Sequence, residues 1–256
     1  MSDIKKVDFK SYAQDFDKHR KADFKLIEIA ADILNLDVNS NILDFGCGTG
    51  NYLKCLQERG FLHLFGLDKS EEMCIISSEK TSAIIKNGSH LDFPFEKASF
   101  RAVIIIDVVH FINDLQGLFK SLQHACEING RVFIATQSHE QLEKRIYSKY
   151  FPSTTEIDKR RHHDIKSLIT IAETCGFSLV SEKKYLSNTD FLVDWDYFDL
   201  INKKSFYVLR LITPEEFNSG MQQFQFDLRD GNIIAKFPGR TLITLEKKEE
   251  ITNGRS

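Results

Sequence analysis

The sequence lacks any long hydrophobic run. Its longest apolar stretch, residues 102–106, is far shorter than the roughly 18 residues that a membrane helix requires. The first residues, Met1 to Lys6, also lack the apolar core of a signal peptide. We therefore expect no contact with a membrane and a cytoplasmic location.

The sequence also lacks a cysteine framework and a strong charge of either sign. Its five cysteines are scattered without a C-x-x-C pair, which argues against disulfides and a zinc site and favours a reducing cytosol. The formal net charge of −3 gives no indication of a nucleic-acid or anionic-lipid partner. The basic run at residues 159–163 has no interleaved aromatic residues, so we expect a solvated loop there. No bound metal is expected, and the oligomeric state, monomer or homodimer, stays open.

The sequence does contain enough hydrophobic material for a core, and it contains a glycine-rich turn. At 256 residues with 42% hydrophobic content, the chain fits one large domain without internal repeats. An apolar strand at residues 42–45 leads into three alternate glycines, and a helix-like stretch follows from Asn51. Glycines let the backbone turn tightly and approach a ligand, and the following helix directs its free amide hydrogens at the bound group.

The spacing of these glycines distinguishes between nucleotide-binding motifs. The run reads D-x-G-x-G-x-G from Asp44 to Gly50, whereas a dinucleotide fold uses G-x-G-x-x-G, and no Gly-Lys-Ser/Thr follows as in a phosphate loop. This run resembles motif I of the class I S-adenosylmethionine-dependent methyltransferases, in particular the small-molecule, methyltransferase-11-like members. An ordinary glycine turn between a strand and a helix is the alternative.

The resemblance implies a fold and a ligand. The fold is α/β, a Rossmann-like sheet of seven mostly parallel strands with helices on both faces and an antiparallel last strand. The ligand is the cofactor S-adenosyl-L-methionine. The alternation of strand and helix patterns along the chain independently indicates a parallel sheet.

An acidic residue follows the next predicted strand, residues 62–67. Asp68 lies about twenty residues past the glycine loop, where a ribose-binding acid belongs. The segment Asp68-x-Ser70-x-x-Met73 again resembles the family pattern, in which the methionine packs near the adenosine. Capping of the helix that starts at Ser70 is the alternative role for Asp68.

The N-terminal segment carries a weaker resemblance. Residues 9–36 predict two helices, and the first contains Tyr12-x-x-x-Phe16-Asp17-x-x-Arg20. This resembles the Y-D-x-x-R lid segment of many small-molecule methyltransferases, with Phe16 in place of the tyrosine. In those enzymes the arginine often reaches the carboxylate of the cofactor's methionine part, which a bidentate guanidinium suits. A solvated, charged helix end is the alternative.

Two positions depart from the family pattern. A third predicted strand, residues 82–85, precedes a segment that looks like the family's adenine-lining stretch, but Ser89 stands where an acid is usual. A serine can meet the adenine amino group without charge, and its neighbour His90 is either an adenine contact or a surface residue. Arg101 stands where an aspartate is usual at the start of the fourth strand.

The fourth predicted strand, residues 101–109, is almost continuously apolar, as expected for a strand covered on both faces. Asp107 and His110 lie at its carboxyl end, where ligands sit in an open α/β sheet. His110 is our candidate for a general base or an acceptor-positioning residue, because imidazole is easily tuned to neutral pH. A histidine packed at a helix start is the alternative.

The residues assigned to cofactor binding are Tyr12, Arg20, Asp44, Gly46, Cys47, Gly48, Asp68, Lys69, Met73, Ser89, His90 and Asp107.

The C-terminal part predicts an insertion before the last strand. A fifth strand at residues 131–136 and a polar helix at 140–150 lead to the aromatic-rich stretch 187–238, which we interpret as a helical lid over the acceptor. A helical extension of the core and a dimer surface are the alternatives. Residues 240–246 predict the last strand, with Thr241 and Thr244 facing outward. The predicted organisation is one methyltransferase domain over residues 1–256, with lid helices in 1–36, a cofactor-binding core in 37–186, a lid insertion in 187–238 and a final strand in 239–247.

The resemblance implies transfer of a methyl group from S-adenosylmethionine by in-line displacement. We expect a small-molecule nucleophile as acceptor, because the charge is mildly acidic and the aromatic segment could enclose an apolar ligand. A peptide or tRNA-nucleoside methyltransferase is an alternative. A non-catalytic S-adenosylmethionine-binding sensor or scaffold is another, which the departures at Ser89 and Arg101 keep open.

Overall fold

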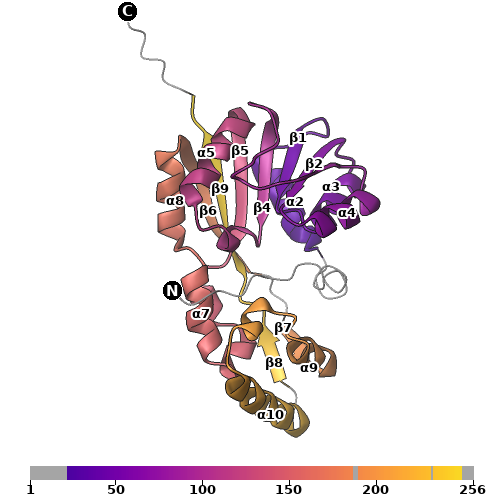
Figure 1. The fold of residues 1–256 in the computed structure, drawn as a ribbon, viewed down its shortest axis with the longest axis vertical. Coiled ribbons are helices and arrows are strands. Elements are labelled where there is room, and N and C mark those ends of the chain that lie inside the picture. The colour runs from indigo at the N-terminus through magenta and orange to yellow at the C-terminus, as the bar shows by residue number, and fades with distance from the viewer. Residues whose placement is uncertain (1–21, 187–189, 232, 250–256) are drawn as a thin grey trace, which may run out of the picture.

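A seven-stranded sheet forms the centre of the computed structural model, which describes residues 22–186, 190–231 and 233–249 (Figure 1). The strand order is β3-β2-β1-β4-β5-β9-β6, and β9 runs in the opposite direction to the other six strands, antiparallel to its neighbours β5 and β6. The predicted seven-stranded, mostly parallel sheet with an antiparallel last strand is confirmed. The strands are β1 (Asn41–Phe45), β2 (His63–Asp68), β3 (Ile84–Asn87), β4 (Phe100–Ile106), β5 (Cys126–Thr136), β6 (Phe177–Tyr185) and β9 (Arg240–Lys247).

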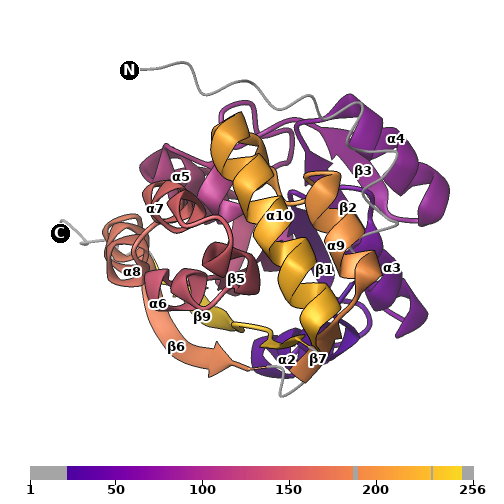
Figure 2. The ribbon, with the colours of Figure 1, turned by 90° about the horizontal axis from the view of Figure 1, so that it is seen from below.

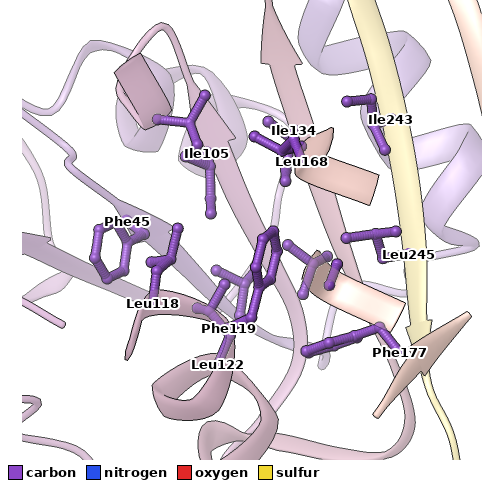
Figure 3. Close-up of a cluster of buried hydrophobic side chains, with 14 of the residues drawn as sticks. Phe45, Ile105, Leu118, Phe119, Leu122, Ile134, Leu168, Phe177, Ile243 and Leu245 are labelled. Carbon is purple, nitrogen blue, oxygen red and sulfur yellow. The ribbon is translucent and has the colours of Figure 1, made fainter. Parts of the chain in front are cut away.

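The central strands are apolar on both faces, and helices cover each face. In β4, Val103 and Ile105 point to one face of the sheet, and Ala102 and Ile104 to the other. Helices α5 (Leu115–Ala125) and α8 (Ile165–Thr174) pack on the first face, where Figure 3 shows their leucines against the sheet. Helices α2 (Phe24–Leu34) and α3 (Asn51–Glu58) cover the second face, and α4 (Glu71–Lys80) packs beside β2 and β3.

A second lobe extends from the edge of the sheet at which β5 and β6 end and β9 begins (Figures 1 and 2). It has its own core, in which aromatic residues from two separate parts of the chain pack together. The first part follows β5 and the second lies between β6 and β9. The elements of the lobe are α6 (His139–Glu143), η2 (Ile146–Lys149), α7 (Ser153–Arg161), β7 (Asp190–Val193), α9 (Trp195–Asn202), η3 (Tyr207–Arg210), α10 (Pro214–Asp230) and β8 (Ile233–Lys236).

Several local predictions were wrong. The third strand begins two residues later than expected, and the helix predicted at residues 140–150 is divided into α6 and η2. Residues 159–161 of the basic run belong to α7 rather than to a loop. Thr241 and Thr244 are buried, because β9 lies between two strands and is covered on both faces. The helix predicted before residue 22 lies outside the described residues. Within the described ranges, no helix is long and apolar enough to cross a bilayer.

Candidate functional site

The glycine loop connects β1 to α3 and is held against the end of β2. The backbone N–H groups of Gly46 and Cys47 both donate to the carbonyl of Leu67, at 2.7 and 3.0 Å. Gly46 has a φ of +78°, and a Cβ at this position would lie 2.6 Å from the methyl carbons of Val108. Only glycine fits there, because the backbone is left-handed and passes close to the segment after β4.

Asp68 ties the glycine loop to the start of α4. One carboxylate oxygen accepts from the N–H of Gly48 at 2.9 Å, and the other accepts from the N–H of Ser70 at 2.9 Å. Burial raises the pKa of Asp68, and these two hydrogen bonds oppose that shift. The helix cap itself is Ser70, whose hydroxyl accepts from the N–H of Met73. The carboxylate therefore stands between two backbone segments, with further acceptor capacity on each oxygen.

Asp44 is buried at the end of β1 and is only 2% exposed. Its Oδ2 has no hydrogen-bond partner among the residues that the structure describes. Burial, reinforced by the charge of Asp68, raises the pKa of the Asp44 carboxyl to about 8. Two carboxyl groups thus meet at the glycine loop, and no countercharge for Asp44 lies within the described part of the chain. A cationic group in this place would stabilise the ionised form of Asp44.

The remaining predicted cofactor contacts differ in burial and in hydrogen bonding. Met73 is buried on α4, whereas Lys69 is exposed at the end of β2. Ser89 donates its hydroxyl and its backbone N–H to Asp92, so a carboxylate is present in this segment although it lies three residues later than the family pattern. The Nε2 of His90 is buried without a partner in the described part of the chain, and burial lowers the pKa of this ring. Tyr12 and Arg20 lie outside the described residues.

Asp107 follows β4 directly and is paired with an arginine. Its backbone is left-handed, with a φ of +55°, and its carboxylate accepts hydrogen bonds from Nε and Nη2 of Arg240, the first residue of β9. Arg240 also forms a weaker ion pair with Asp23, the residue that caps α2. One partner of Asp107 is therefore an arginine of the last strand, which links the end of β4 to the start of β9.

His110 lies in the short helix η1 (Val109–Phe111), directly after β4. Its ring stacks on the ring of His162, with centroids 4.2 Å apart and 16° between the planes. Burial and the neighbouring His162 lower the pKa of His110 well below its ordinary value. Its Nδ1 is buried and has no partner among the described residues. The ring is thus neutral at pH 7 and presents an unsatisfied nitrogen, which an acceptor proton or another polar group could meet.

The sequence analysis missed a buried charged cluster around His162. The carboxylate of Asp158 pairs with both Arg145 and Arg161, and the Nδ1 of His162 lies 2.9 Å from the carbonyl of Asp158. Burial, followed by the charge of Arg145, lowers the pKa of His162 to about 3. The sequence contained one indication of this cluster, since Asp158 directly precedes the basic run. In a helix, side chains three or four residues apart lie on the same face and can form an ion pair. Among the described residues, no group of three or more side chains is suited to hold a metal ion.

Comparisons with known proteins identify a family and related folds. A family model described as a methyltransferase domain matches residues 16–182. A structure described as a methyltransferase from an antibiotic biosynthesis pathway of Anabaena variabilis superposes with a TM-score of 0.73 at 18% identity, covering 88% of this chain and 98% of that chain. A search of curated proteins gives no significant match.

Two further similar structures differ in what they are reported to do. The geranyl diphosphate C-methyltransferase of Streptomyces coelicolor, solved with S-adenosyl-L-homocysteine, has a TM-score of 0.56 at 15% identity, over 87% of this chain and 78% of that chain. The cyclase SpnF has a TM-score of 0.61 at 12% identity, over 89% of this chain and 81% of that chain. At these identities the likeness shows a shared fold, and the reaction has to be argued from the site.

Proposed function

Because the chain belongs to the methyltransferase-domain family, whose fold it shares with class I S-adenosylmethionine-dependent methyltransferases, we propose that it transfers a methyl group from S-adenosylmethionine to a small-molecule nucleophile. The observation that carries the proposal is the pair of carboxyl groups at the glycine loop. Asp44 is buried with an oxygen that has no partner in the described ranges, and Asp68 faces the loop from the neighbouring strand. Both groups fit a ligand that combines positive charge with hydroxyl groups.

The residues present divide naturally over the parts of such a cofactor. Asp68 would accept hydrogen bonds from the ribose hydroxyls, each worth about 1.5–3 kcal/mol for a charged acceptor. Asp44 would balance the positive charge of the bound group. Ser89, His90 and Met73 are the proposed neighbours of the adenine side. When bound, the cofactor supplies a sulfonium, from which a methyl group is readily displaced.

His110 is the proposed base on the acceptor side. A neutral imidazole whose Nδ1 has no partner among the described residues can take the proton that an oxygen or nitrogen nucleophile loses. Its lowered pKa makes it a weaker base than an ordinary histidine, and a general base contributes at most roughly 10²–10⁴-fold. The larger share of the catalysis comes from alignment, since holding the reacting atoms in line supplies roughly 7–11 kcal/mol. The protein therefore needs no catalytic triad.

Its thiols are free, four of the five being buried, which supports a reducing compartment such as the cytoplasm.

The departure at Ser89 favours one second candidate, a cofactor-binding sensor or scaffold without chemistry. Ser89 and Asp92 are hydrogen-bonded to each other. Their contact with adenine would therefore be weaker than that of a carboxylate without such a bond. The likeness to SpnF also shows that this fold serves proteins that are not named as methyltransferases.

The decisive experiment uses S-adenosylmethionine with a labelled methyl group and a cell extract divided into small-molecule, protein and RNA fractions. Methyl transfer to a small-molecule fraction is expected. Label in the protein or RNA fraction would show that the acceptor is a protein or an RNA instead of a small molecule. Binding of S-adenosylmethionine without transfer to any fraction would favour the sensor. In parallel, calorimetry with S-adenosylhomocysteine should give at least about tenfold weaker binding for Asp68→Asn, through loss of charged hydrogen bonds. Glu71→Gln, a neighbouring exposed acid on α4, is the matched control and should bind normally.

A further inference from the structure

The charged cluster between the lobe and the sheet contains more positive than negative charge. Arg145 and Arg161 share the carboxylate of Asp158, whose side chain is 3% exposed. In the described part of the chain, no other carboxylate contacts either guanidinium. His110 and His162 are both neutral, because burial lowers the pKa of each ring. Asp107, whose charge also acts on both histidine rings, is bonded to Arg240. Among the described residues, one positive charge of the arginine pair is therefore left without a direct counterion in a largely desolvated place, and such a charge is costly unless a ligand pairs with it.

Arg161 has one open edge. Its Nη1 donates to Asp158 at 3.1 Å, and its Cζ lies 5.3 Å from the ring centroid of Phe111 and 4.5 Å from that of Tyr207. Among the described residues, its Nε and Nη2 have no hydrogen-bond acceptor, and the side chain is 15% exposed. The Nε–Nη2 edge of a guanidinium holds two parallel N–H donors, which match the two oxygens of a carboxylate.

An independent observation points to the same place. The buried Nδ1 of His110 has no partner within the described ranges, and the charges of Arg161 and Arg145 both act on this ring. His110 and Phe111 follow β4 directly, and their rings lie 4.2 Å apart. The unsatisfied nitrogen and the open guanidinium edge thus belong to one region, at the carboxyl ends of β4 and β5, where a ligand of an open α/β sheet binds.

We propose that the methyl acceptor is a monocarboxylate, held through its carboxylate by the open edge of Arg161 and placed beside His110. This inference rests on the proposed methyl transfer and names its substrate class. A single negative charge balances the single excess positive charge, whereas a phosphate dianion would leave the cluster negative. The rings of Phe111, Tyr207 and Tyr147 around the two guanidinium groups favour a planar or apolar body on the acid.

Calorimetry on the protein saturated with S-adenosylhomocysteine tests the proposal. The probes are benzoate, phenylacetate and cinnamate, the primary amide of each acid, and phenyl phosphate. At least one carboxylate is expected to bind about tenfold or more tightly than its amide, which corresponds to one charge-assisted contact. Arg161→Gln should abolish this preference, and Arg161→Lys, which keeps the charge but loses the paired donors, should reduce it at least about threefold. Arg160→Gln, an exposed neighbour on the same helix, should retain the preference in full.

The outcomes separate this proposal from the one on which it rests. Failure of S-adenosylhomocysteine to bind would refute the proposed function itself. Normal cofactor binding with no carboxylate preferred over its amide would refute the acid site alone. A preference for phenyl phosphate over every carboxylate would overturn the assignment in favour of a phosphoryl group. If Arg161→Gln does not fold, as judged by its loss of cofactor binding, Arg161→Lys decides, and an undiminished carboxylate preference in that variant would contradict the paired contact.

Discussion

Asp44 provides a test at the scale of a single residue. With the pKa of its carboxyl raised to about 8 by burial and by Asp68, it is largely protonated at pH 7 in the free protein. A cationic ligand at the glycine loop stabilises the carboxylate and lowers that pKa. We therefore expect S-adenosylmethionine binding at pH 7 to release up to about one proton. Calorimetry in buffers of different ionisation enthalpy measures this release.

Asp44→Asn should bind the cofactor without releasing this proton, whereas Asp32→Asn, an exposed acid of α2, should behave as the wild type. Equal proton release by Asp44→Asn would disprove the role. Stability gives a second readout, because the native pKa lies above the ordinary value of 3.8. The stabilisation from protonated Asp44 is complete below that ordinary value and is lost as the pH rises toward 8. The wild type should thus lose up to about 1.4 kcal/mol per pH unit relative to Asp44→Asn over this range.

His110 supports a second residue-scale prediction. His110→Ala should keep the affinity for S-adenosylhomocysteine but lower kcat by roughly 10²–10⁴-fold, if the nucleophile must lose a proton. His124→Ala, an exposed histidine of α5, is the control. Because burial and His162 lower the pKa of His110 well below its ordinary value, the wild-type rate should show no loss from titration of this ring between pH 6.5 and 8. An unchanged kcat in His110→Ala would return the residue to a packing role.

At the scale of elements, Gly50 fixes how closely α3 approaches α4. It has a φ of +78°, and a Cβ there would lie 2.4 Å from the hydroxyl oxygen of Ser77. Gly50→Ala should therefore destabilise the protein by two contributions. The left-handed backbone costs about 1–2 kcal/mol for a residue other than glycine, and overpacking adds about 1–3 kcal/mol. Urea denaturation measures the free energy of unfolding.

The chain offers a control for each contribution. Gly60 has a similar φ of +89°, but nothing lies within 4 Å of an added Cβ, so Gly60→Ala should show the backbone cost alone. Combining Gly50→Ala with Ser77→Ala removes the colliding hydroxyl and should recover most of the overpacking cost. If the changes in the free energy of unfolding caused by the two substitutions simply add, α3 and α4 move apart at this contact and no overpacking cost remains to be recovered.

The elements that the sequence predicted best are those with a strong local pattern. The glycine loop, its strand and the acid after β2 follow from spacing alone, and β4 and β5 are recognisable because they are apolar on both faces. The bounds predicted for the third strand were wrong by two residues. The reason is that β3 is a short edge strand that is largely exposed and has no clear apolar alternation. Thr241 and Thr244 were assigned to the wrong environment because alternation within β9 does not reveal that the strand lies between two others.

At the scale of the whole molecule, local patterns fail because the second lobe joins distant segments. Its aromatic stretch after β6 was evident from composition. The contribution of Tyr147, Tyr150 and Phe151 was not, since these residues follow β5 and meet the aromatic stretch only in the folded chain. The pairing of Asp158 with two arginines was missed for the same reason. Arg145 meets Asp158 only in the folded chain, and these charged groups are a candidate ligand site only because the folded lobe buries them. Tertiary packing, rather than propensity, decides this part of the molecule.

The lobe has a core separate from the two that flank the sheet, so a core substitution there should act on the lobe first. Phe224 of α10 is 1% exposed, and its ring centroid lies 4.6 Å from that of Tyr150 and 5.5 Å from that of Phe198. Phe224→Ala should destabilise the lobe by about 3–5 kcal/mol. Hydrogen exchange should then quicken across the lobe while β1, β4 and β5 keep their protection, because local opening requires less free energy than global unfolding.

The same helix supplies the matched substitution. Phe226 is 64% exposed, so Phe226→Ala removes an equal side chain without opening a cavity and should leave exchange unchanged. S-adenosylhomocysteine affinity separates the two lobes functionally, since the glycine loop and Asp68 belong to the sheet. Phe224→Ala should therefore retain cofactor binding but lose the preference for carboxylate probes, whose proposed site contains Arg161 at the end of α7. Faster exchange throughout the sheet, or loss of both activities together, would mean that the lobes unfold as one cooperative unit and that the acceptor side cannot be altered independently.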